Sequence, residues 1–307
     1  PVLHVLHERK IKGRPDGVKC LVMVPTHELA LQTENVFRVL GKHTRVKAFA
    51  IYGGVEQDPQ IKQLDRGVDV LIATPGRMFD LVSQGALILK RVEILVLDEA
   101  DHMLDLGFIK DVRFLLRRCP PPQERLGLLF SATMPPEIRR LAGNILRDPA
   151  TVQVGITAPA DTVSHTLYPV ARHLKTALLL KLLGNTKTKS VLVFTRTKHR
   201  AKNLGKKLVT AGYRSASLQG NLSQARRQAA LDGFRNGTFQ ILVATDIAAR
   251  GIDVTRISHV INFDIPSTPE AYIHRIGRTG RATRSGEAFT LITGEDKAMV
   301  LAINQII

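Results

Sequence analysis

Three acids follow an apolar run near the middle of the first half of the chain. The run is Ile94–Leu97, and Asp98-Glu99-Ala100-Asp101 comes directly after it. Ligands of open α/β sheets bind beyond the carboxyl ends of the strands, so these acids are well placed to hold a metal ion. Mg²⁺ keeps several waters and can be held by one carboxylate, such as Asp98, while Glu99 could orient and deprotonate an attacking water. An acidic helix start, stabilised by the helix dipole, explains these acids equally well.

A cluster of arginines lies far downstream, in the stretch His274–Arg281. Residues 275, 278, 281 and 284 are all arginine, a spacing that also suits a solvated basic helix face. Gly277 and Gly280 interrupt this pattern, and glycine is unfavourable inside a helix. We therefore interpret the stretch as a phosphate clamp, because guanidinium groups match phosphate oxygens and stay charged. Acids and arginines together could complete a phosphoryl-transfer site that neither motif forms alone.

A third candidate is the stretch Ala244–Asp253, which follows the apolar run Ile241–Val243. The Thr245 hydroxyl and the free backbone N–H groups after a strand suit a phosphate. Weaker candidates also follow apolar runs, and each alone is more typical of a turn or a helix cap. They are Gly53-Gly54, Thr74–Arg77, Ser131–Thr133 and Gln219-Gly220. No G-x-x-x-x-G-K-S/T phosphate loop occurs in the chain.

The elements that must position these residues alternate between short β-branched apolar runs and helical patterns. The predicted strands are 18–24, 46–52, 68–73, 93–97, 126–130, 165–170, 190–194, 214–218, 240–243, 259–261 and 287–292. The predicted helices are 28–40, 57–65, 77–83, 108–117, 136–145, 173–183, 198–210, 224–235, 269–275 and 296–303. This alternation predicts parallel sheets with helices on both faces. Runs such as Ile94–Leu97, which lack polar alternation, are typical of strands buried on both sides.

The length of 307 residues is enough for two domains, each with its own core. Residues 154–162 include glycine, proline and small residues, a composition typical of a hinge. We predict a first domain over residues 1–155, a linker over 156–163 and a second domain over 164–307. Two α/β units joined in this way create a cleft between them, where ligands usually bind.

The charge distribution indicates a polyanionic partner. The formal net charge is +17, and it is uneven: residues 1–155 hold 22 Lys and Arg against 18 Asp and Glu, whereas residues 156–307 hold 22 against 9, so the two parts carry +4 and +13. Clustered cations favour phosphates, so nucleic acid is the expected partner and a solvated basic surface is the alternative. The chain has two cysteines, no apolar run long enough to span a membrane and no signal peptide, so we expect a cytoplasmic protein.

The order and spacing of the motifs resemble the DEAD-box RNA helicases over nearly the whole chain. Two stretches, Leu192–Lys198 and Gln219–Gln224, look closest to the bacterial RhlE-type group. The resemblance implies two RecA-like domains that close on ATP and RNA, with ATP and Mg²⁺ as cofactors. It also implies ATP hydrolysis coupled to separation of short RNA duplexes. The motifs that carry it are Pro25–Ala30, Gly53-Gly54, Thr74–Arg77, Asp98–Asp101, Ser131–Thr133, Phe194, Gln224–Arg227, Ala244–Asp253 and His274–Arg281.

The resemblance further implies roles for individual residues. Asp98 would hold Mg²⁺ and Glu99 would activate water, while Arg278 and Arg281 would act as arginine fingers. The nucleotide contacts would be Asp253, at the ribose, and Gly251. The residues that couple hydrolysis to strand separation would be Ser131, Thr133, Asp101 and His274, the last two meeting across the cleft. RNA phosphates would lie on Pro25, Thr26, His27, Gly54, Thr74, Arg77, Gly220 and Thr245.

Two departures from the family pattern stand out. The family usually has arginine where this chain has His27, and a neutral imidazole binds phosphate more weakly than a guanidinium. The family's adenine-reading segment and phosphate loop would precede Pro1, so we expect the chain alone to bind RNA weakly and to hydrolyse little ATP. We also expect the second domain, whose strand set is complete, to be more stable against unfolding than the first.

Two alternative functions stay open from the sequence. The first is an RNA-binding fragment without hydrolysis, and the second is a DNA-directed helicase of the same superfamily 2. The Asp98–Asp101 motif together with His274–Arg281 argues against the second. The expected partners are single-stranded or short duplex RNA and ribosomal or RNA-degradation complexes, with no membrane contact, and the protein is expected to be a monomer.

Overall fold

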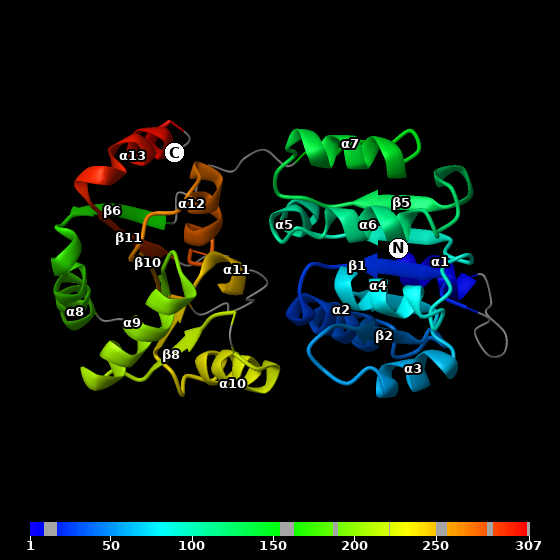
Figure 1. The fold of residues 1–307 in the computed structure, drawn as a ribbon, viewed down its shortest axis with the longest axis horizontal. Coiled ribbons are helices and arrows are strands. Elements are labelled where there is room, and N and C mark those ends of the chain that lie inside the picture. The colour runs from blue at the N-terminus through cyan, green and yellow to red at the C-terminus, as the bar shows by residue number, and fades with distance from the viewer. Residues whose placement is uncertain are drawn as a thin grey trace. The chain divides into compact units, whose positions relative to one another are not determined.

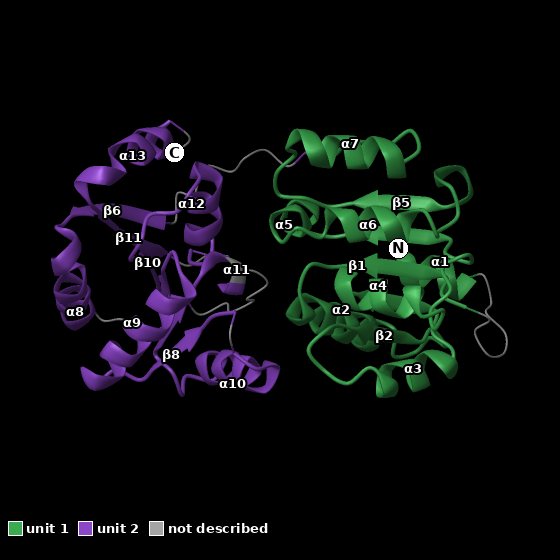
Figure 2. Cartoon of the chain, in the orientation of Figure 1, with its two compact units in different colours: residues 1–152 green, residues 153–307 purple. Residues whose placement is uncertain are grey.

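The computed structural model describes residues 1–8, 17–153, 163–186, 190–220, 222–249, 257–280 and 285–305. They form two compact units, residues 1–152 and residues 153–307, each built on its own parallel sheet (Figures 1 and 2). The predicted fold class is therefore confirmed. The predicted linker lies outside the described residues except for Val163, which begins a strand.

Unit 1 is a five-stranded parallel sheet in the order β2-β3-β1-β4-β5. Its strands are β1 Cys20–Met23, β2 Ala48–Ile51, β3 Val70–Ala73, β4 Ile94–Leu97 and β5 Leu126–Leu129. Its helices are α1 Val2–Glu8, α2 His27–Leu40, α3 Asp58–Asp65, α4 Pro75–Ser83, α5 Ala100–Asp105, α6 Ile109–Leu116 and α7 Pro136–Ile145, with a 3-10 turn η1 at Pro122–Glu124. Because the strands are parallel, their carboxyl ends all lie along one edge of the sheet.

Helices cover both faces of the unit 1 sheet because successive strand residues point to opposite faces. In β1, Leu21 and Met23 belong to a core that α4, α5, α6 and α7 cover. Cys20 and Val22 belong to a second core, which α1 and α2 cover on the other face. None of these four residues is more than 5% exposed. The unbroken apolar runs therefore mark strands buried on both sides, as predicted.

Unit 2 is a six-stranded parallel sheet in the order β6-β11-β10-β7-β9-β8. Its strands are β6 Val163–Pro169, β7 Val191–Phe194, β8 Ser215–Leu218, β9 Ile241–Ala244, β10 His259–Asn262 and β11 Gly286–Ile292. Its helices are α8 Lys175–Asn185, α9 Lys198–Thr210, α10 Gln224–Arg235, α11 Asp246–Ala249, α12 Pro269–Ile276 and α13 Lys297–Asn304, with 3-10 turns η2 at Arg172–Leu174 and η3 at Gly294–Asp296. The two faces of β7 again belong to separate cores.

Every predicted strand is present within two residues of its predicted bounds, and α7, α9 and α10 have the bounds predicted for them. Three short helices, α1, α5 and α11, were not predicted. They span four to seven residues, too few for a helical period to be recognised. Among the helices of the described ranges, none is both long and apolar enough to cross a membrane.

Candidate functional site

The five candidate loops of unit 1 lie next to one another at the carboxyl edge of its sheet. The strand order places Gly53-Gly54 after β2, Thr74–Arg77 after β3, Pro25–Glu28 after β1, Asp98–Asp101 after β4 and Ser131–Thr133 after β5. The three candidate phosphate-binding loops therefore follow adjacent strands. The acid loop and the hydroxyl loop follow the next two. The chain order conceals this grouping, because β1 is first in the chain and third in the sheet.

The loop after β4 holds its acids on an unusual backbone. Glu99 has φ 49° and ψ 52°, the left-handed region that residues other than glycine rarely adopt. Asp98 accepts a hydrogen bond from the Glu99 N–H at 2.9 Å, and its own N–H donates to the Met23 carbonyl at 3.0 Å. Backbone strain of this kind clusters at functional sites, where a side chain must be held in one direction.

Burial is the main cause that raises the pKa of Asp98 above its ordinary value. The hydrogen bond from the Glu99 N–H lowers that pKa, whereas the negative charges of Glu99 and Asp101 raise it. A bound cation would offset both the burial and the repulsion. Among the described residues no three His, Cys, Asp or Glu side chains form a metal cage. A single carboxylate can hold a hydrated Mg²⁺, so the chemistry of Asp98 suits this ion, and its role as the ligand stays a prediction.

His102 is a site residue that the sequence analysis missed. Its Nδ1 lies 2.9 Å from Oε2 of Glu99, and the ring is only 4% exposed. Its Nε2 is buried and has no hydrogen-bond partner in the described part of the chain. The short helix α5 places His102 one turn after Glu99, so the imidazole can fix the direction of the carboxylate. In the sequence, the available signal was a histidine three residues after Glu99, the candidate general base.

A hydrogen-bond network joins the loops after β4 and β5. Oδ2 of Asp101 accepts from the backbone N–H and the hydroxyl of Thr133, at 3.0 and 2.9 Å. The Asp101 N–H donates to Oγ of Ser131 at 3.1 Å, and that hydroxyl donates to the Thr133 carbonyl at 2.7 Å. The structure thus brings three predicted coupling residues into one network. A shift of either loop must displace the other.

The loop after β1 leads into α2, and the N-terminus of that helix is capped by a side chain. Oγ1 of Thr26 accepts from the Leu29 N–H at 3.3 Å, as an N-cap residue does. His27 is 9% exposed, its Nδ1 lies 2.9 Å from Oε2 of Glu28, and its ring centroid lies 5.6 Å from that of Tyr52. His27 is thus held largely inside unit 1. Its contact with RNA stays a prediction.

The loops after β2 and β3 are tied together by Arg77. Its Nη2 donates to the Val55 carbonyl at 2.6 Å, which links α4 to the Gly53-Gly54 loop. Its Nη1 is buried and has no partner within the described ranges. Gly54 has φ 82°, and Thr74 is the N-cap residue of α4. Because an unpaired buried guanidinium nitrogen is unfavourable, a phosphate oxygen is a fitting acceptor here.

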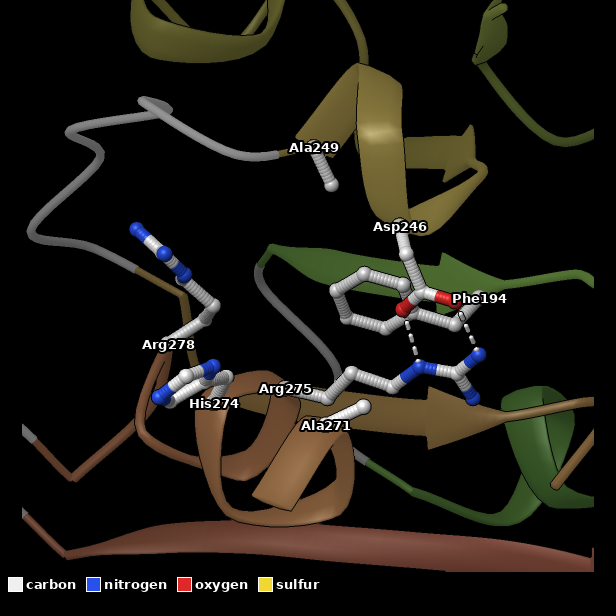
Figure 3. A pocket seen from close by; sticks show the side chains of 7 residues that line it. All are labelled: Phe194, Asp246, Ala249, Ala271, His274, Arg275 and Arg278. Atoms are coloured by element: carbon white, nitrogen blue, oxygen red, sulfur yellow. Dashed lines mark hydrogen bonds and ion pairs between the residues drawn. The ribbon is translucent and has the colours of Figure 1, made fainter. Parts of the chain in front are cut away.

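Three of the unit 2 motifs meet at a small pocket of about 20 Å³ at the carboxyl edge of that sheet. Figure 3 shows the pocket from close by. Its lining comes from the end of β7, from α11 and from the end of α12 with the turn that follows. The lining residues are Phe194, Asp246, Ala249, Ala271, His274, Arg275 and Arg278.

Arg275 is a structural residue of this pocket. Its Nε and Nη2 donate to the two carboxylate oxygens of Asp246 at 2.5 and 2.7 Å, and Nη1 donates to Oδ1 of Asn262 at 3.0 Å and to the Asp264 carbonyl at 2.6 Å. The side chain is 2% exposed and lies over the Phe194 ring. Arg275 therefore belongs to α12, and its nitrogens hold unit 2 together instead of joining a phosphate clamp.

Arg278 lies beyond the helix end at Gly277 and points away from the Arg275–Asp246 pair (Figure 3). The turn that carries it is fixed from behind. Thr279 is 3% exposed, and its hydroxyl donates to the Ile257 carbonyl at 2.7 Å. Arg278 is therefore presented at the pocket from a turn that unit 2 holds in place.

The remaining predicted residues of unit 2 divide into two groups. Gly220 and Thr245 follow β8 and β9, which are neighbours in the sheet, so both lie at its carboxyl edge. Gly251, Asp253 and Arg281 lie outside the described residues. The two units are described separately, so the contact predicted between Asp101 of unit 1 and His274 of unit 2 stays a prediction.

Comparison with known proteins gives one consistent family. Residues 1–141 match DEAD/DEAH box helicases, and residues 174–283 match the helicase conserved C-terminal domain. The chain is 41% identical over 305 residues to the ATP-dependent RNA helicase RhlB of Pasteurella multocida, covering 99% of this chain and 72% of that protein. It is 40% identical over 305 residues to the RhlB of Histophilus somni, covering 99% and 73%.

A solved structure agrees with these relatives. S. cerevisiae Dbp5 bound to RNA and ADP-BeF3 is 30% identical, with a TM-score of 0.83, and the match covers 94% of this chain and 75% of that one. The RhlB name of the bacterial relatives differs from the RhlE-type group that two stretches of the sequence resemble. Both names fall within the one family.

Proposed function

The chain belongs to the DEAD/DEAH box helicase family, and on that premise we propose that the full-length protein hydrolyses ATP and couples hydrolysis to RNA binding and local duplex unwinding. One observation carries the proposal. At the carboxyl edge of unit 1, three loops suited to phosphates follow β2, β3 and β1, and the acid and hydroxyl loops follow β4 and β5 beside them. One edge of the sheet thus offers an RNA path next to a site for hydrolysis.

Hydrolysis is assigned to the acid loop. Asp98 holds the hydrated Mg²⁺, which when bound neutralises charge on the phosphates of the nucleotide. Glu99 orients the attacking water and accepts its proton. The contact with His102 at 2.9 Å keeps the Glu99 carboxylate in one direction. The left-handed backbone of Glu99 serves the same end.

Charge neutralisation in the transition state is assigned to Arg278 and Arg281, with Asp253 and Gly251 contacting the nucleotide. Guanidinium groups suit this role because they stay charged and match phosphoryl oxygens. The turn held by Thr279 supports the assignment of Arg278, since it restricts where that side chain can reach. Arg275 is excluded from the role because its nitrogens donate within unit 2.

Coupling is assigned to the network of Asp101, Ser131 and Thr133. When the γ-phosphoryl group leaves, movement of the acid loop passes through the two Asp101–Thr133 hydrogen bonds to the loop after β5. His274 supplies the corresponding contact from unit 2. RNA phosphates are bound without regard to sequence, mainly through backbone N–H groups and the free Nη1 of Arg77. We assign Gly54, Thr74, Pro25, Thr26 and His27 to that path.

The wider assignments follow from the same family. The protein acts as a monomer in the cytoplasm, on single-stranded or short duplex RNA. Ribosomal or RNA-degradation complexes are its proposed setting. The excess of cations in the second half of the chain, +13 over residues 156–307, supports an RNA partner over a small-molecule substrate.

The test is an ATPase assay on the full-length protein with single-stranded RNA, with DNA of the same sequence and without nucleic acid. RNA should stimulate hydrolysis, DNA should not, and chelation of Mg²⁺ should abolish the activity. Equal stimulation by DNA would support a DNA-directed helicase. RNA binding without any ATP hydrolysis would support a binding protein, and either result would overturn the proposal.

A further inference from the structure

A groove of about 620 Å³ lies in unit 2 beside the edge strand β8, and its lining comes from α9, from β8 and from the start of α10. It runs from Gln219, at the carboxyl end of β8, to Ser215 at the other end of that strand. Gly205 lets α9 approach the strand closely, since a Cβ there would lie 3.2 Å from the Ser217 side chain. The motif stretches named above contribute four lining residues, Lys198, Gln219, Leu222 and Arg226, and the other lining residues belong to none of those motifs.

The lining of the groove is strongly basic. Lys198, Lys202 and Lys206 recur every four residues along α9 and so share one helix face, and Arg226 of α10 also lines the groove. His199 adds a further ring, and no acid is among the residues that line the groove. Lys202 and Lys206 are exposed, and neither has an ion-pair partner in the part of the chain that the structure describes. Two uncompensated cations, Lys202 and Lys206, on one face of α9 favour a polyanion.

A second observation points to a ligand. Ser215 lines the groove and is 8% exposed, yet its Oγ is buried and has no hydrogen-bond partner among the described residues. Buried hydroxyl groups are nearly always paired, because leaving one unpaired is unfavourable. A ligand with oxygen acceptors that reached the end of the groove would supply the missing partner.

We propose that this groove, lined by Lys198, Lys202, Lys206, Arg226 and Ser215, binds the phosphate backbone of RNA that extends beyond the strand held at the carboxyl edge. The position supports this, because the groove begins at Gln219, next to the predicted RNA contact Gly220. The lysine row spans about 12 Å from Lys198 to Lys206, which matches about three phosphates at the rise of a helical strand. The inference rests on the proposed function for its choice of RNA as the polyanion.

The test measures how RNA binding by the full-length protein depends on salt and on RNA length. A short single strand is compared with the same strand extended at either end. The double variant Lys202→Ala/Lys206→Ala should bind the short strand like the parent and the extended strand more weakly. For the extended strand, loss of two phosphate contacts should make the negative slope of log K against log salt shallower by about 1.4. The loss of affinity between 50 and 200 mM salt should then be about sevenfold smaller than in the parent.

The matched control is the double variant Lys181→Ala/Lys207→Ala, which removes the same charge from exposed positions of α8 and α9 outside the groove. It should keep the slope of the parent. Ser215→Ala is a second probe, because removing an unpaired buried hydroxyl should not weaken the fold yet should weaken binding of the extended strand.

Equal slopes of log K against log salt in the two double variants would overturn the proposal. A loss of affinity confined to the short strand would overturn it as well. Binding of poly-aspartate that needs Lys202 and Lys206, with RNA binding unchanged, would assign the groove to an acidic protein instead. These results are independent of catalysis. A parent protein without RNA-stimulated ATPase would contradict the proposed function, while the binding slopes alone decide the groove.

Discussion

Arg275 and Arg278 lie three residues apart in one arginine-rich motif, and their surroundings differ. Arg275 is buried, and its nitrogens donate to Asp246, Asn262 and the Asp264 carbonyl. Arg278 lies on the turn after α12 and points away from that network. Removal of a charge from a buried pair affects folding, whereas removal of a charge aimed at a substrate affects turnover.

Arg278→Ala should therefore slow ATP hydrolysis far more than it weakens ATP binding. Its charge is needed most where negative charge spreads over the phosphoryl group in the transition state, and arginine-finger losses are about 10³–10⁵ in rate. Steady-state kinetics of the full-length protein would measure kcat and KM separately. A change confined to KM would show that Arg278 binds only the ground state.

Arg275→Ala should instead lower the stability of unit 2. It leaves Asp246 without its partner, and breaking a buried pair in this way costs about 3–5 kcal/mol. Thermal or urea unfolding would measure the loss, with Arg278→Ala as the neighbouring comparison that should lose much less stability. Similar unfolding curves for the two variants would contradict the division of roles.

Glu99→Gln should abolish most turnover and preserve ATP binding. The amide keeps the shape of the side chain and can still contact His102, but it cannot accept the proton of the water. Loss of a general base costs about 10²–10⁴ in rate. Single-turnover hydrolysis and nucleotide titration would measure the two effects, and turnover near that of the parent would remove Glu99 from its role.

Asp98→Asn should stabilise unit 1 at neutral pH while it abolishes hydrolysis. Burial raises the pKa of Asp98 in the folded protein, so the ionised carboxylate opposes folding at pH values above that raised pKa and has no effect below the unfolded value of 3.8. The gain in the free energy of unfolding should therefore grow as the pH rises from about 4 and level off above the raised pKa. Unfolding of both proteins across this pH range would test it, and a gain that was the same at every pH would contradict it.

Among the elements, β11 fixes the turn that carries Arg278. A Cβ at Gly286, the first residue of β11, would lie 2.5 Å from the Gly280 backbone nitrogen and 2.4 Å from the Thr279 hydroxyl. A backbone atom at such a distance could move aside only at a large cost in free energy. The glycine is therefore required so that the strand can pass directly behind the turn.

Gly286→Ala should destabilise unit 2 by about 1–3 kcal/mol, the usual effect of overpacking, and should lower kcat by displacing Arg278. Gly294→Ala is the matched control, because nothing lies within 4 Å of a Cβ at that position. Unfolding and ATPase assays of both variants would test the prediction. Normal hydrolysis by Gly286→Ala would show that the turn does not depend on β11.

On the scale of the whole molecule, each unit has its own sheet and its own cores, and the charge is concentrated in the second half of the chain. Residues 163–307 should therefore fold when produced alone and should bind RNA with a marked dependence on salt. Circular dichroism melting and RNA titration at several salt concentrations would test both points. Failure to melt cooperatively, or RNA binding that salt does not weaken, would contradict the prediction.

Local patterns in the sequence determined the elements, the parallel fold class and the motifs, because the strand and helix periods and the residues that follow an apolar run are all short-range properties. The tertiary structure alone decided the strand order, which sets the candidate phosphate-binding loops on one side of β4 and the hydroxyl loop on the other. It also decided that His27 and Arg275 are held inside their units and that His102 fixes Glu99. These outcomes depend on which distant segments pack together, and no local period contains that information.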